Sequence, residues 1–90
     1  MSATDYNGWT NWETWNLNLW IDNEYDLWKA KVDNLRWVPP SAVDAQFVKT
    51  FALEFLPNGT PDFDDIRDYE RVNFTEIAEH WLLEKVELDQ

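Results

Sequence analysis

The chain has 90 residues with 18 Asp or Glu against seven Lys or Arg, which gives a formal net charge of −11. At this length one domain (1–90) is expected, and a content of 44% hydrophobic and 17% aromatic residues excludes an intrinsically disordered acidic chain. The chain has no cysteine, and no run approaches the ~18 apolar residues of a membrane-spanning helix. We therefore expect a cytoplasmic protein without disulfides or membrane contact.

The first predicted element is a helical region from Thr10 to Trp37. The polar start of the chain resembles neither a signal peptide nor an anchor, and residues 1–9 are expected to be flexible or loosely packed. Thr10 or Asn11 is a suitable N-cap, and a bend is expected near residues 22–23, with the helix resuming at about residue 25. Whether this is one kinked helix or two stays open. Helical spacing places three tryptophans in the core: Trp12, Trp15 and Trp20.

Two further helices are predicted, one before and one after residues 57–61, whose Pro, Asn and Gly residues predict a turn. Ser41 is the expected N-cap of the first, with Asp44 in the capping-box position, and Thr60 is the expected N-cap of a short acidic helix with Pro61 at its first position. The first of these helices carries one apolar stripe: Val43, Phe47, Val48, Phe51, Ala52 and Phe55.

The last predicted element is an amphipathic helix that begins at Asn73, where Glu76 follows three residues later. No segment alternates with a period of two residues over the length of a strand. The sequence therefore predicts an all-α fold, a compact single-domain bundle of four to five helices.

Two stretches of the chain resemble a known family. The opening YNGWTNWETW (6–15), which continues to LWIDNE (19–24), and the later VNFTEIAEH (72–80) are similar to small acidic proteins encoded by phages, plasmids and many prokaryotic genomes. Together they cover about a third of the chain. The family has no established general activity, so the resemblance implies a setting among mobile elements and their hosts, and no mechanism.

The residue inventory does not favour an enzyme. His80, the only histidine, is one turn from Glu76 and Glu84, a spacing that suits a metal or an acid–base pair but is more typical of a surface imidazole. No Ser-His-Asp order or H-E-x-x-H motif is present, and two glycines do not build a phosphate loop. We therefore predict no catalytic residues, no metal and no cofactor.

The acidic block at residues 62–70 has two interpretations. It is either a solvated face, on which Arg67 and Arg71 pair with Asp64 and Asp68, or a mimic of nucleic-acid phosphates. Averaged over the surface, the chain carries one net charge per roughly 500 Å², whereas duplex DNA carries one per about 110 Å². Mimicry therefore requires the acidic residues to gather on one face. Without a basic groove, direct binding to nucleic acid is not expected.

The charge and the resemblance together predict a binding protein. We expect a phage-type inhibitor, monomeric or a small homo-oligomer, that binds a basic, nucleic-acid-binding host defence protein, as anti-CRISPR or anti-restriction proteins do. The alternative is a structural protein that self-associates through its Trp-rich first helix. Trp9, Trp28 and Trp37 are candidates for partial exposure. The predicted partner contacts are Asp62, Asp64, Asp65 and Asp68, followed by Glu24, Asp26, Glu76 and Glu79.

Overall fold

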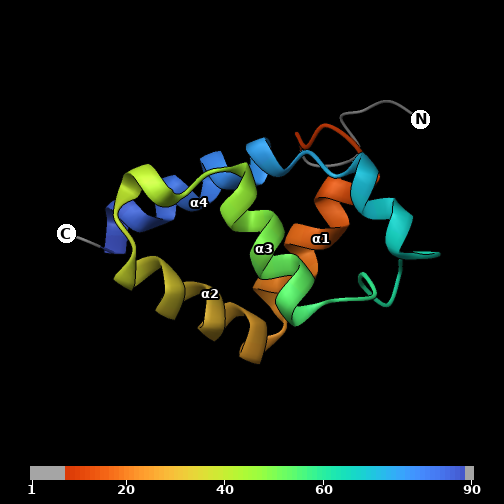
Figure 1. Ribbon diagram of the computed structural model, residues 1–90, viewed down its shortest axis with the longest axis horizontal. Helices are drawn as coiled ribbons and strands as arrows, with labels where there is room; N and C mark the ends of the chain where they lie inside the picture. The colour runs from red at the N-terminus through yellow and green to blue at the C-terminus, as the bar shows by residue number, and fades with distance from the viewer. Residues whose placement is uncertain (1–7, 89–90) are drawn as a thin grey trace.

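A computed structural model describes residues 8–88 (Figure 1). In this part of the chain the elements are four α-helices and two short 3₁₀ helices, without a strand, which confirms the predicted all-α class. The elements are α1 (Trp12–Asn23), α2 (Tyr25–Trp37), η2 (Pro40–Ala42), α3 (Ala45–Phe55), η3 (Ile66–Arg71) and α4 (Phe74–Leu88). None of the helices in this range is both long and apolar enough to cross a membrane.

The helices form two packed pairs, α1 with α2 and α3 with α4. Figure 1 shows α1 and α2 as a V whose vertex lies at the lower edge, with α3 between the arms and α4 along the upper edge. The short helix η3 packs against α1 on the right of this view. The bundle measures 38 × 27 × 22 Å and has an accessible surface of 5740 Å².

The bend between α1 and α2 is confirmed and divides the region into two helices. Glu24 has an extended backbone (φ −91°, ψ 116°), so it caps the end of α1 and the start of α2. Its N–H donates to the carbonyl of Trp20 at 3.1 Å, and its carbonyl accepts the N–H of Trp28 at 2.9 Å. Both helix ends are therefore hydrogen-bonded through one residue, which fixes the corner.

The core is made by one side of each helix, and Trp81 at its centre is only 1% exposed. The rings of Phe47 and Phe51 lie nearly perpendicular to the Trp81 ring, with centroids 6.1 and 5.3 Å away. The other core residues contributed by the four helices are Leu17, Ile21, Leu35, Val48, Ala52, Ile77 and Ala78.

Of the three tryptophans predicted to form the core, Trp12, Trp15 and Trp20, none is fully buried: all are half-buried, and Trp12 packs against the core. Their helix buries Thr14 and Asn16 beside Leu17 and Ile21. These two polar side chains can be buried because each hydrogen-bonds to a segment distant in the sequence. Trp28 and Trp37 are exposed, as predicted, at 42% and 88%, while Trp9 is half-buried.

A buried lysine joins three elements of the bundle. Lys31 of α2 is 1% exposed, and its ammonium pairs with Asp22 at the end of α1 and with Glu84 of α4, the latter at 2.8 Å. The same nitrogen lies 5.8 Å from the centroid of the Trp81 ring. The ammonium therefore has charged partners on both neighbouring helices.

Two predicted helix starts are corrected by the structure. The N-cap of α3 is Asp44, whose carboxylate accepts the N–H of Phe47, while Ser41 lies in η2. Of the predicted stripe, Val43 precedes the helix, Phe47 is half-buried and Phe55 is exposed.

The acidic helix begins at Ile66 with Asp65 as its N-cap. Thr60 is instead buried in the loop before it, where its hydroxyl donates to Asn16 at 2.6 Å and accepts the N–H of Asp62 at 3.2 Å. The last predicted start is confirmed, since the Asn73 side chain accepts the N–H of Glu76 at 3.0 Å.

Candidate functional site

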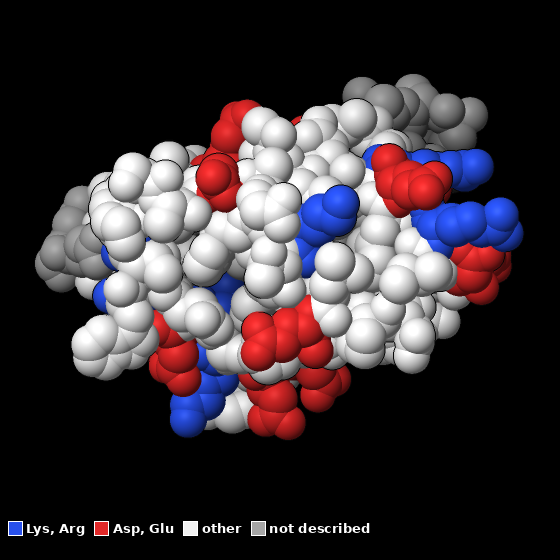
Figure 2. Space-filling view, in the orientation of Figure 1, with Lys and Arg blue, Asp and Glu red and all other residues white. Residues whose placement is uncertain are grey.

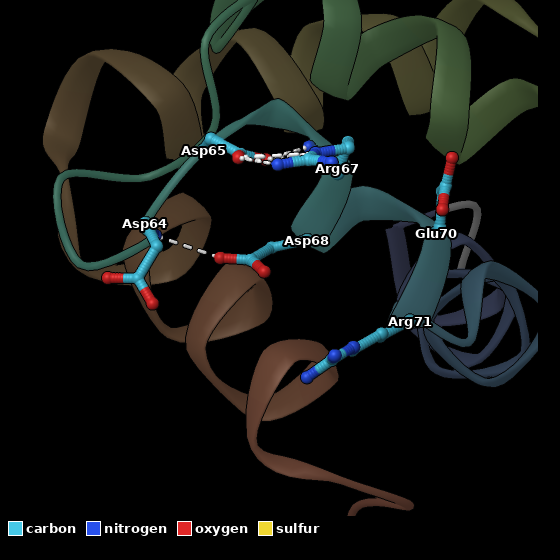
Figure 3. A pocket seen from close by; sticks show the side chains of 6 residues that line it. All are labelled: Asp64, Asp65, Arg67, Asp68, Glu70 and Arg71. Atoms are coloured by element: carbon cyan, nitrogen blue, oxygen red, sulfur yellow. Dashed lines mark hydrogen bonds and ion pairs between the residues drawn. The ribbon is translucent and has the colours of Figure 1, made fainter.

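Three of the four preferred contact residues line one hollow of about 460 Å³ beside η3 (Figure 3). Asp64, Asp65 and Asp68 share it with Arg67, Glu70 and Arg71. The structure thus brings Asp64, Asp65 and Asp68 together, as the sequence suggested, but it places two guanidinium groups among them.

The charges of this hollow are partly compensated within the molecule. Arg67 donates to Asp65 at 3.0 Å, a contact that lowers the pKa of the Asp65 carboxyl below its usual value of 3.8 and raises the pKa of Arg67. Asp68 accepts the backbone N–H of Asp64 at 2.8 Å, and Figure 3 shows that both bonds join the loop before η3 to the first residues of that helix. The hollow is therefore a surface of mixed charge.

The predicted pairing of Arg67 with Asp64 and of Arg71 with Asp68 is wrong. Arg67 turns to the N-cap residue Asp65, and Arg71 reaches Glu13 of α1 at 3.5 Å. The prediction assumed an α-helix through residues 64–71, whereas the helix that forms is a 3₁₀ helix starting at Ile66. The arginine side chains therefore point away from their predicted partners.

Asp62, the fourth preferred residue, lies outside the hollow and against α1. Its Oδ2 accepts the side-chain amide of Asn16 at 2.9 Å and the indole N–H of Trp20 at 2.8 Å. The two donors lower the pKa of Asp62 below its usual 3.8, with the Asn16 bond first. With Thr60 bonded to Asn16, these contacts fasten the loop before η3 to α1.

Glu24 and Asp26 lie at the corner between α1 and α2, where both residues are exposed. Neither forms an ion pair within residues 8–88. On the face drawn in Figure 2, the largest group of Asp and Glu side chains lies along the lower edge, where Figure 1 places this corner. Over η3, in contrast, red and blue side chains alternate.

Two exposed aromatic side chains accompany the acidic residues of the corner. Tyr25 is 65% exposed and Trp28 is 42% exposed, and their ring centroids lie 6.1 Å apart. Among the ring pairs formed within residues 8–88, this is the one in which both residues are exposed. The corner therefore combines uncompensated carboxylates with accessible aromatic surface.

The last two predicted contacts, Glu76 and Glu79, lie in the first turns of α4. Glu76 is half-buried and accepts the N–H of Thr10 at 2.9 Å, while Glu79 is exposed. The eight predicted residues consequently occupy separate parts of the surface: the loop and η3, the α1–α2 corner, and the start of α4. On the face shown in Figure 2 the acidic side chains likewise form separate groups.

His80 contacts an aromatic ring from the start of the described chain. The Trp9 ring lies over it at a centroid distance of 4.3 Å, and the imidazole is exposed. Of the predicted loosely packed start, residues 1–7 lie outside the described range. Within residues 8–88 no group of three or more His, Cys, Asp or Glu side chains has a geometry suited to a metal ion.

Comparison with known proteins gives one match. The model of a family of unknown function, DUF7249, matches residues 2–86, which is nearly the whole chain. Neither the curated proteins nor the solved structures contain a significant match.

Proposed function

The chain belongs to the DUF7249 family, and we propose that it is a stoichiometric inhibitor that binds a basic, nucleic-acid-binding protein of a host defence system. Anti-CRISPR and anti-restriction proteins act in this way. The proposal places the protein in the host cytoplasm, encoded by a phage or another mobile element, and gives it no direct contact with nucleic acid. The resemblance of residues 6–24 and 72–80 to proteins of mobile elements supports this setting.

The observation that carries the proposal is the uncompensated acidic surface. Within residues 8–88 the carboxylates in ion pairs are those of Glu13, Asp22, Asp65 and Glu84. Lys31 and Lys85 are buried, so two of the seven basic residues add little positive charge to the surface. A net charge of −11 then speeds encounter with a positive partner, and aromatic anchors prolong the complex.

The α1–α2 corner is a better contact surface than the η3 hollow. At the hollow an approaching cation meets Arg67 and Arg71 as well as carboxylates. At the corner Glu24 and Asp26 have no ion-pair partner within residues 8–88, and exposed aromatic rings lie beside them. Charge and anchor residues coincide there, as in protein-binding hot spots.

Affinity capture from host lysate with salt elution tests the proposal. Two double variants carry the same change in net charge: Glu24→Lys/Asp26→Lys at the corner and Asp64→Lys/Glu70→Lys at the hollow. The four carboxylates take part in no hydrogen bond or ion pair within residues 8–88, so the fold should survive. We expect the wild type and the hollow variant to retain a nucleic-acid-binding protein and the corner variant to lose it. Capture only of proteins that do not bind nucleic acid, unchanged by either variant, would refute the proposal.

A second candidate function, self-association, is favoured by Trp37. This side chain is 88% exposed at the end of α2, and a large exposed indole favours burial against another surface. Molecular size at several salt concentrations separates the two functions. A hydrophobic oligomer persists at about 1 M salt, where the screening length is ~3 Å and charge-driven capture is lost.

A further inference from the structure

We propose that Glu24, Tyr25 and Trp28 form a site for one arginine side chain presented by the basic partner. This inference rests on the proposed function, because it assigns the contact surface and the chemical group that the surface recognises. The site consists of two exposed aromatic rings and one carboxylate on a rigid corner of the bundle.

The two rings are held by the first turn of α2. Residues three apart on a helix are neighbours, so Tyr25 and Trp28 present their rings on one strip of the first turn of α2. Their planes are inclined by 37°, so the rings are not stacked face to face, and both residues are exposed to solvent. Because ring faces carry partial negative charge, the strip attracts cations as well as apolar groups.

The carboxylate of Glu24 is positioned by a backbone that is bonded on both sides. Its N–H is held by Trp20 and its carbonyl by Trp28, so the Cα position is fixed by α1 and α2 together. The carboxylate has no ion-pair partner within residues 8–88. An unpaired anion on a fixed Cα position can meet a cation without first giving up an ion pair of its own.

The nearest basic side chain of the same helix lies on the other side of Tyr25. At about 100° per residue, Trp28 and Glu24 fall on one side of Tyr25, and Asp26 and Lys29 fall on the other. Lys31 falls on the same side as Trp28 and Glu24, but its ammonium is buried and paired with two carboxylates. A cation that approaches the exposed ring of Trp28 therefore meets an aromatic face and the negative charge of Glu24. Lys29 adds its positive charge at the opposite edge of the site.

The chemistry of the site favours a guanidinium over an ammonium. A guanidinium is planar and weakly hydrated, so it stacks on an indole while its N–H groups donate to a carboxylate. An ammonium is a point charge with a strong hydration shell and uses only part of this arrangement. We therefore expect an arginine peptide to bind more tightly than a lysine peptide of equal charge.

The experiment is an NMR titration of the full chain at low ionic strength with an alternating Arg-Gly peptide, and with a Lys-Gly peptide of the same length. Indole N–H signals are assigned with Trp28→Phe and Trp37→Phe. We expect the Trp28 signal to shift and the Trp37 signal to stay. Affinity for the arginine peptide should fall about tenfold in Trp28→Ala and should largely return in Trp28→Phe.

Glu24→Gln should weaken arginine-peptide binding severalfold, whereas Trp37→Ala, which removes a more exposed indole, should leave it unchanged. If the arginine peptide binds Trp28→Ala and Glu24→Gln as tightly as it binds the wild type, the arginine site is refuted. A basic partner that binds another surface remains consistent with that result. If neither peptide binds even at low ionic strength, both the site and the proposed function are refuted. Equal affinity for the two peptides would also contradict the guanidinium site.

Discussion

The hydroxyl of Thr14 accepts the backbone N–H of Asn73 at 2.8 Å and thereby joins the first turn of α1 to the N-cap of α4. The same hydroxyl donates to the side chain of Asn11 at 2.6 Å, and the Asn73 amide reaches Thr10 at 3.3 Å. Two stretches about sixty residues apart thus meet through their capping residues. Their shared role in the structure is to fix two helix starts against each other.

Thr14→Val should destabilise the protein by about 1–3 kcal/mol, because valine has the shape of threonine but leaves the N–H of Asn73 unpaired. The measurement is the free energy of unfolding in urea. Thr75→Val, at an exposed position of α4, is the matched control and should change this free energy by no more than about 0.5 kcal/mol. Equal effects of the two substitutions would contradict the role given to Thr14.

Gly59→Ala should cost more stability than Gly8→Ala. Both glycines have a positive φ, of 87° and 91°, so alanine introduces backbone strain of about 1–2 kcal/mol at each. A Cβ at residue 59 also lies 2.8 Å from Cδ2 of Phe63, whereas none of the described atoms lies within 4 Å of one at residue 8. The difference between the two unfolding free energies measures the contact with Phe63, and a difference of zero would show that this ring moves freely.

Removing the partners of Lys31 should be more harmful than removing Lys31 itself. Asp22→Asn with Glu84→Gln leaves a buried ammonium without a counter-charge, at a cost of about 3 kcal/mol. Lys31→Met leaves two carboxylates that are 35% and 41% exposed and stay hydrated, so it should cost no more than about 1 kcal/mol. Chemical denaturation of the two variants measures the order, and the reverse order would contradict it.

Tyr69 should make the protein unstable in alkali. Burial raises its pKa from 10.0 to about 12, so between these values the unfolded state loses the phenolic proton and the folded state keeps it. The stability contribution is complete below pH 10.0 and is lost as the pH rises towards 12, a fall of about 3 kcal/mol.

Unfolding free energies of the wild type and Tyr69→Phe across this pH range test the prediction. The phenylalanine variant should lack the fall, because it has no phenol to ionise. Tyr25→Phe, at an exposed position, should retain it. Parallel curves for the wild type and Tyr69→Phe would contradict the assignment.

The helices could be predicted because their signals are local. The Pro and Gly positions, the apolar stripes and the Asn73 cap each depend on residues within one or two turns. At Thr60 the hydroxyl does accept the N–H of Asp62, but a turn follows instead of a helix, and the hydroxyl also donates to Asn16, 44 residues away. The tryptophans of α1 are less buried than predicted, because distant hydrogen bonds allow Thr14 and Asn16 to be buried in their stead.

For the candidate site, the sequence predicts which residues are acidic but not how they pair or which of them lie together on the surface. The acidic block of residues 64–68 is visible in the sequence, but its pairing depends on where the 3₁₀ helix begins, which decides the directions of Arg67 and Arg71. The α1–α2 corner can serve as a contact surface because Tyr25 and Trp28 are exposed, and their exposure depends on which face of α2 packs on the bundle. That choice is made by tertiary packing around Lys31 and Leu35.

The most direct measurement is the dissociation constant of the complex with the captured defence protein at fixed salt. It compares Glu24→Lys/Asp26→Lys with Glu70→Lys/Glu87→Lys, which has the same net charge but changes exposed residues away from the corner. We predict that the corner variant binds at least about tenfold more weakly than this control. Equal weakening of both variants would show that overall charge alone drives binding and would contradict a contact surface at the α1–α2 corner.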